Sequence, residues 1–215
     1  MIRAHVERPL LSLLVRPDKP VPPTIEVAEA LLPAGRIGPG SVCYCAGVGE
    51  DIALERHLAE ALGADVWAFD PTPRAIQFMA RAPYDASRIV FEPIGLWSDD
   101  TVLRFNAPAN PAHVSHSIVE ELGGDGFFDA PCRSVASVMA ANGHDHLDLL
   151  KMNIEGAEDV VLEAALAAGI RPGVIALTWE GPNAMKKAYD WTSRLRGEGY
   201  RLLGHVGWYF TYVAA

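Results

Sequence analysis

The chain has 215 residues, which suits one domain with a sizeable core and is short for two. Half of its residues are hydrophobic and the formal net charge is -9, so broad attraction to nucleic acid or to an anionic membrane is not expected. Its Lys and Arg residues are scattered, whereas a surface that follows phosphates would need them clustered. We therefore expect no nucleic-acid partner and no membrane partner.

The first 40 residues are expected to form an entry segment that precedes the main domain. The apolar stretch over residues 10–15 is too short to span a bilayer and lacks a small-residue cleavage site. The proline-rich run over residues 17–23 cannot lie inside a helix. Residues 24–32 are predicted to be helical, because apolar positions recur there at helical spacing after a threonine that suits an N-cap. We predict a helical and proline-rich segment over residues 1–40 and the main domain over residues 41–215.

The cysteine content favours a reducing, cytoplasmic setting. The chain has an odd number of cysteines, which are Cys43, Cys45 and Cys132. No second Cys or His pair follows the first two at zinc-ligand spacing.

From residue 41 onward, short apolar runs alternate with helical periods. Alternation of this kind is typical of a parallel sheet covered by helices on both faces. The last two strands are joined by a tight turn at Gly207 and must be antiparallel. The sequence thus predicts an α/β, Rossmann-like fold with a mostly parallel seven-stranded sheet that ends in an antiparallel hairpin. The predicted strands are 41–45, 66–69, 88–96, 147–154, 173–179, 200–205 and 208–213, and the predicted helices are 51–62, 73–81, 135–141, 157–168 and 183–196.

Residues 106–133 are expected to form a long irregular loop after a short extended stretch at 102–105. Irregular loops of this length in a compact domain usually serve a function or are disordered. This loop carries His113 and His116 among hydroxyl side chains, and the pair Gly123-Gly124 is suited to a hinge. We interpret the loop as a lid that orders when a ligand binds.

The segment after the first core strand is predicted to hold a nucleoside ligand. Gly47 and Gly49 let the backbone approach a ligand closely, and Glu50 or Asp51 suits the positive end of the helix that follows. The second strand ends in Asp70, which is placed to accept hydrogen bonds from ribose hydroxyls. The dinucleotide pattern would need a third glycine where Ile52 stands, which disfavours a nicotinamide cofactor.

Four segments resemble the FkbM-type methyltransferases. They are residues 47–51 (GVGED), 69–73 (FDPTP), 113–117 (HVSHS) and above all 148–158 (DLLKMNIEGAE), which is close to the family signature iDllKiDiEGaE. The resemblance runs from about residue 41 to the end. It implies a class I methyltransferase fold, S-adenosylmethionine as methyl donor, and a small-molecule substrate, usually a hydroxyl acceptor on a sugar or secondary metabolite. Cys45 and Asn153 stand where many family members have an acid. The lost acid at Cys45 would weaken the hold on the methionine end unless Glu50 or Asp51 compensates.

Thirteen residues are assigned to the site on this basis. His116, with His113 second, is the expected general base, because imidazole titrates near working pH. Lys151, Asn153 and Glu155 are expected to share one face of their strand. A structural pair of Lys151 with Glu155 or Asp148 is the alternative to a catalytic role. The predicted catalytic residues are His116, His113, Lys151 and Glu155, and the predicted cofactor-binding residues are Cys45, Gly47, Val48, Gly49, Glu50, Asp70, Pro71, Gly95 and Asn153.

No metal site is predicted, because Glu155, Glu158 and Glu180 lack tight ligand spacing. Two other functions stay open. One is a methyltransferase-like module that binds the cofactor without turnover, and the other, less favoured, is an NAD-dependent oxidoreductase. The sequence leaves the oligomeric state open and allows a homo-oligomer.

Overall fold

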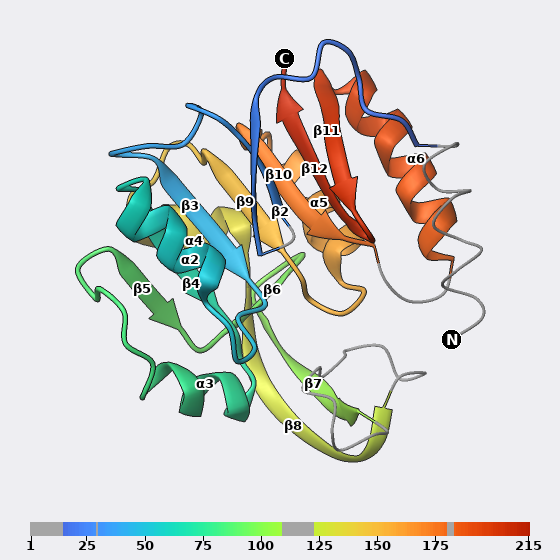
Figure 1. Cartoon of the computed structure of the whole chain (residues 1–215). Coiled ribbons are helices and arrows are strands. Elements are labelled where there is room, and N and C mark those ends of the chain that lie inside the picture. Colours follow the sequence, from blue (N-terminus) through green and yellow to red (C-terminus); the bar gives the residue numbers. More distant parts are fainter. Residues whose placement is uncertain (1–14, 29, 109–122, 180–182) are drawn as a thin grey trace.

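A seven-stranded, mostly parallel sheet runs through the part of the chain that the computed structural model describes, residues 15–28, 30–108, 123–179 and 183–215 (Figure 1). Only β12 is antiparallel to its neighbours in this sheet, as predicted for the hairpin at Gly207. The order across the sheet is β11-β12-β10-β9-β3-β4-β5. The strands are β3 (Val42–Ala46), β4 (Asp65–Phe69), β5 (Ile89–Glu92), β9 (Leu149–Met152), β10 (Val174–Thr178), β11 (Tyr200–Val206) and β12 (Tyr209–Ala214).

The strand order reverses beside β3. The chain runs from β3 outward to β4 and β5 on one side, and later from β9 outward to β10 on the other. In open sheets of this kind, the connections that leave the carboxyl ends of the two central strands diverge, and a crevice opens between them. The topology therefore places a ligand crevice above β3 and β9.

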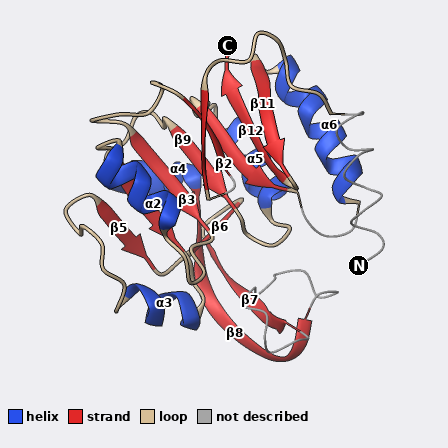
Figure 2. Cartoon of the chain, in the orientation of Figure 1, coloured by secondary structure: helices blue, strands red, loops and turns tan. Residues whose placement is uncertain are grey.

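Helices cover both faces of the sheet, as the alternating pattern predicts (Figure 2). One face packs against α4 (Val135–Asn142), α5 (Glu158–Ala167) and α6 (Ala184–Gly197). The other face packs against α2 (Ala53–Arg56), its π-helical continuation η1 (His57–Ala61) and α3 (Pro73–Met79). Among the described residues, no helix combines the length and the apolar composition that a bilayer crossing needs.

Two of the helices begin where their capping residues predict. The side chain of Thr72 accepts a hydrogen bond from the backbone N–H of Ala75, and α3 has a proline in its first turn. Ser134 caps α4 in the same way through Ser137, and Gly143 ends that helix in the left-handed conformation.

The predicted helix over residues 24–32 is wrong. This segment forms an antiparallel hairpin of β1 (Thr24–Val27) and β2 (Ala30–Pro33). Three of the four residues of β1 are β-branched, which favours a strand over a helix. Ala30 and Leu32 are buried in the apolar cluster under α2, so this part of the entry segment is attached to the sheet.

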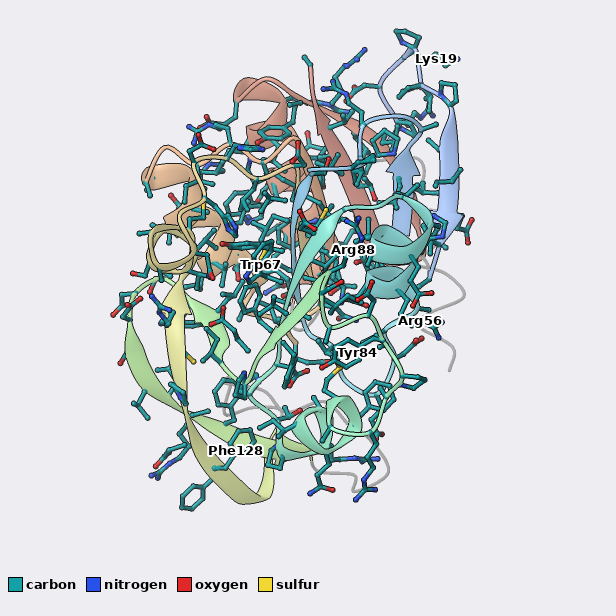
Figure 3. All side chains as sticks on the ribbon, turned by 90° about the vertical axis from the view of Figure 1, so that its left-hand side faces the viewer. Lys19, Arg56, Trp67, Tyr84, Arg88 and Phe128 are labelled. Carbon is teal, nitrogen blue, oxygen red and sulfur yellow. The ribbon has the colours of Figure 1, made fainter. Side chains whose placement is uncertain are left out.

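The region predicted as one strand, a short extended stretch and a long loop forms a second sheet of order β6-β8-β7. The extended stretch predicted over residues 102–105 is confirmed, because it lies within β7. The strand predicted over residues 88–96 is divided at Pro93 into β5 and β6 (Gly95–Trp97). β7 (Thr101–Pro108) pairs with β8 (Gly123–Ser134), and Gly123 lies opposite Pro108, so the glycine pair belongs to a strand rather than a hinge. Figure 3 shows this ribbon extending below the main sheet, with Phe128 on it. The expected lid residues, His113 and His116, lie outside the described residues.

The second sheet forms because apolar residues alternate along both strands. Leu103 and Phe105 of β7 pack with Phe128, Ala130 and Cys132 of β8 in a small apolar cluster. This period of two is the signal for a half-buried strand, and it is present in the sequence.

The attachment of the hairpin predicts a large stability difference between two of its residues. Leu32 is buried, so Leu32→Ala should lower the free energy of unfolding by about 2–5 kcal/mol through lost burial and a cavity. Ile25 is among the exposed large hydrophobic residues, so Ile25→Ala should change it by only about 0.5 kcal/mol. Urea titration measures both values. Equal, small effects would show that the hairpin does not belong to the core.

Candidate functional site

A cleft opens at the carboxyl ends of β3, β4 and β9, beside the point where the strand order reverses. One wall comes from the second sheet, because Gly95, Leu96 and Phe105 line the cleft together with the loops of the main sheet. The full lining is Ala46, Gly47, Val48, Gly49, Phe69, Asp70, Pro71, Thr72, Gly95, Leu96, Phe105, Asn153, Ile154, Glu155 and Ala157.

The floor of the cleft has no room for a side chain at Gly47. This residue has a φ of +83°, and a Cβ built on it would lie 1.8 Å from the carbonyl oxygen of Asn153. Its N–H donates to the carbonyl of Phe69 at 2.9 Å, and the N–H of Asn153 donates to the carbonyl of Ala46 at 3.0 Å. The loops that follow β3 and β9 therefore touch through their backbones, which only glycine permits.

Asp70 joins the end of β4 to the glycine loop. Its Oδ2 accepts from the Gly49 N–H at 2.9 Å, and its Oδ1 accepts from the Thr72 N–H at 2.9 Å and the Thr72 hydroxyl at 2.6 Å. An ionised carboxylate offers roughly four acceptor positions. With three of them used, the Asp70 carboxylate keeps one for a ligand hydroxyl.

The loop after β9 is held in place by a buried acid, Glu158, which accepts hydrogen bonds from its backbone. Its carboxylate accepts from the N–H groups of Ile154 at 2.8 Å and Gly156 at 2.9 Å, and the Thr178 hydroxyl lies 3.1 Å away. Burial raises the pKa of Glu158 above its usual value, although these backbone donors act in the opposite direction. The loop between the two donors carries Glu155 at a φ of +57°, a strained conformation for a residue with a side chain. Glu158 thus fixes the backbone that brings Glu155 to the cleft.

Lys151 does not line this cleft. Its Nζ donates to the carbonyl of Gly47 at 2.7 Å and lies 3.5 Å from Oε1 of Glu55 on α2. The expected shared face with Asn153 and Glu155 is wrong, because β9 ends at Met152 and the chain then turns out of the strand.

The alternative structural pairs of Lys151 are wrong as well. Asp148 accepts a hydrogen bond from the N–H of Val42, at the opposite end of the sheet, and the ion-pair partner of Lys151 is Glu55. Sequence spacing could not reveal this partner, which comes from a different element.

Two predicted cofactor residues also lie away from the cleft. Cys45 is completely buried in the apolar cluster on the α2 side, and burial raises the pKa of its thiol well above the usual value. Glu50 forms an exposed ion pair with Arg74 at 2.8 Å. Asp51, considered as a substitute acid, accepts from the N–H of Ala53 at the start of α2.

Eight of the thirteen predicted residues are brought together at the cleft, and two, His113 and His116, lie outside the described residues. The eight are Gly47, Val48, Gly49, Asp70, Pro71, Gly95, Asn153 and Glu155.

Sequence reasoning missed the apolar wall and the groups that support the loops. Phe105 ends the stretch over residues 102–105 that is predicted to be extended, but that prediction does not place its side chain at the cleft. Thr72 was readable as a helix N-cap before Pro73, but its hydroxyl bond to Asp70 depends on the folded turn. Gly95 is required by packing, since a Cβ there would lie 2.7 Å from the sulfur of Cys132.

Within the described ranges, no group of three or more His, Cys, Asp or Glu side chains is placed to hold a metal ion. Comparisons of the chain with protein-family models, with curated proteins and with solved structures give no match.

The contact at Gly47 predicts an unusually costly glycine-to-alanine change. Gly47→Ala places a methyl group against the Asn153 backbone, so it should lower the free energy of unfolding by about 1–3 kcal/mol beyond the cost of its positive φ. Gly40→Ala is the matched control, because Gly40 has a φ of +84° and nothing within 4 Å of its Cβ position. Urea unfolding gives the free energy of unfolding of both variants. The difference between their losses is the cost of the steric clash at residue 47, because the cost of the positive φ is common to both. If both lose the same stability, the loops do not touch as described.

Proposed function

We propose that the protein is an S-adenosylmethionine-dependent methyltransferase that acts on a hydroxyl group of a sugar or secondary metabolite. One observation carries the proposal: the glycine loop at residues 47–49 and the buried carboxylate of Asp70 meet in a cleft at the reversal of strand order. A nucleoside ligand needs both features, a backbone that it can approach and an acceptor for its ribose.

The residues of the cleft fit this cofactor. Gly49 has nothing within 4 Å of its Cβ position, so the space above it is free for a ligand. Asp70 would accept a bond from a ribose hydroxyl, and the apolar side chains of Leu96 and Phe105 offer a wall for a flat base. Glu155 would supply the negative charge that the ammonium of the methionine end needs. On this proposal, Glu155 takes the part that the sequence suggested for Glu50 or Asp51.

The observed layout supports the proposal independently of the cleft. The FkbM resemblance implies a class I fold, whose sheet is mostly parallel and ends in an antiparallel hairpin, and the main sheet here has this arrangement.

When bound, the cofactor supplies a methyl group already activated on a sulfonium. The chain has to align the acceptor with that methyl group, exclude water and remove the hydroxyl proton. Asn153 lines the cleft at the end of β9, where it would orient the acceptor. His116, with His113 second, stays the proposed base on sequence grounds alone.

A module that binds the cofactor without turnover is the second candidate. The observation that favours it is the position of Lys151, a predicted catalytic residue whose ammonium is occupied by Gly47 and Glu55. Turnover with labelled donor and a panel of sugars and natural-product alcohols distinguishes a methyltransferase from such a module.

Cofactor binding tests the proposal most simply. The wild-type protein should bind S-adenosylmethionine and its demethylated product in isothermal titration. Gly49→Val should weaken that binding by at least about 100-fold, because its side chain would enter the space that the ligand needs. Gly35→Val is the control, since Gly35 also has a positive φ (+74°) and open space but does not line the cleft. Circular dichroism checks that both variants fold.

Wild-type protein that binds neither form of the cofactor would reject the function. Equal affinity of Gly49→Val and wild type would reject the assignment of the cleft.

A further inference from the structure

We propose that Glu55, acting through Lys151, is the positioning residue that sets the shape of the glycine loop at 47–49 and thereby the affinity for the cofactor. The inference rests on the proposed function where it concerns affinity, whereas the part that concerns the loop stands independently. Neither residue contacts the cleft, so their action is indirect.

Three elements distant in the sequence meet at this network. Lys151 comes from β9, Glu55 from α2 and Gly47 from the loop between β3 and α2. Lys151 Nζ donates to the Gly47 carbonyl at 2.7 Å, the shorter of its two contacts, and lies 3.5 Å from Glu55 Oε1. The Lys151 ammonium therefore binds the carbonyl group of Gly47, and the Cα of Gly47 faces the backbone of Asn153 on the side where a Cβ would project.

Burial makes the two charges depend on each other. Lys151 is 7% exposed and Glu55 is 1% exposed. A buried charge is costly unless an opposite charge or hydrogen bonds compensate it. Glu55 Oε1 accepts no hydrogen bond from the residues that the structure describes, so its compensation at that oxygen comes from the Lys151 charge. Glu55 therefore compensates the buried charge of Lys151, and the Lys151 side chain holds the carbonyl group of Gly47.

The position of Glu55 has no evident structural reason on its own helix. Its neighbours Leu54 and Leu58 are buried apolar residues, and an apolar residue at position 55 would pack there without a desolvation cost. If the ion pair only fastened α2 to the sheet, removing it would change stability and leave the glycine loop and cofactor affinity unchanged. The two roles therefore differ in a measurable quantity.

Cys45 supplies a site for rescue. It lies directly opposite Lys151 in the pairing of β3 with β9, and it is buried in the cluster on the α2 side. Burial has the largest effect on the pKa of the Cys45 thiol and raises it; the Glu55 carboxylate also raises it and Lys151 lowers it, as expected for neighbours. An aspartate at position 45 would therefore place a carboxylate beside Lys151 from the neighbouring strand.

The test compares Glu55→Gln, the double variant Cys45→Asp/Glu55→Gln, and Glu60→Gln. Glu60 is the matched control, because it lies one turn later and pairs with Arg56 on the surface. Isothermal titration gives the affinity for S-adenosylmethionine. Hydrogen exchange of the ligand-free proteins reports on the loop, whose Gly47 and Gly49 amides are bonded to Phe69 and Asp70.

Glu55→Gln should weaken cofactor binding by about 10-fold or more, because removing one charge of a buried ion pair leaves the Lys151 charge uncompensated. It should also speed exchange at Gly47 and Gly49 more than in β12. The double variant should recover both properties, and Glu60→Gln should match the wild type.

Unchanged affinity and unchanged loop exchange in Glu55→Gln would overturn the inference, as would a double variant no better than the single one. Wild-type protein that binds no cofactor would reject the proposed function. Hydrogen exchange at Gly47 and Gly49 alone would then test whether Glu55 and Lys151 set the shape of the glycine loop.

Discussion

The backbone contact between Gly47 and Asn153 is the constraint on which the rest of the site depends. A Cβ at residue 47 would lie 1.8 Å from the carbonyl oxygen of Asn153. The loops that follow the two central strands can therefore meet only if residue 47 is glycine. The contact lies where the strand order reverses, so the fold opens the crevice and the glycine sets its floor. Lys151, Asp70 and Glu158 each hold one of these loops through backbone groups.

The loops of the site contact one another mainly through backbone groups, and buried charged side chains hold these loops in place. Asp70 holds the amide of Gly49, Lys151 holds the carbonyl of Gly47, and Glu158 holds the amides on both sides of Glu155. Buried acids and bases of this kind are costly unless they are bonded. Their cost is offset here by donors and acceptors that belong to the loops, so each charged side chain fixes the loop backbone to which it is bonded.

Local signals in the sequence predicted most of the main sheet and much of the cleft. The glycines after β3, the acid after β4 and the hairpin at Gly207 follow from short-range rules, and the structure agrees with them. The rules failed where two signals competed, as in residues 24–33, where apolar spacing suggested a helix and β-branched residues formed a strand. They also failed where the partner is remote: nothing near Lys151 in the sequence identifies Glu55, and nothing near Cys45 shows that its side chain faces α2.

A crystal structure of the protein with S-adenosylhomocysteine bound tests the central claim most directly. The account predicts ligand density in the cleft above Gly47 and Gly49, with a ribose hydroxyl on the Asp70 carboxylate and the amino-acid end toward Glu155. Density at another place on the molecule, or a ligand whose ribose is remote from Asp70, would contradict it.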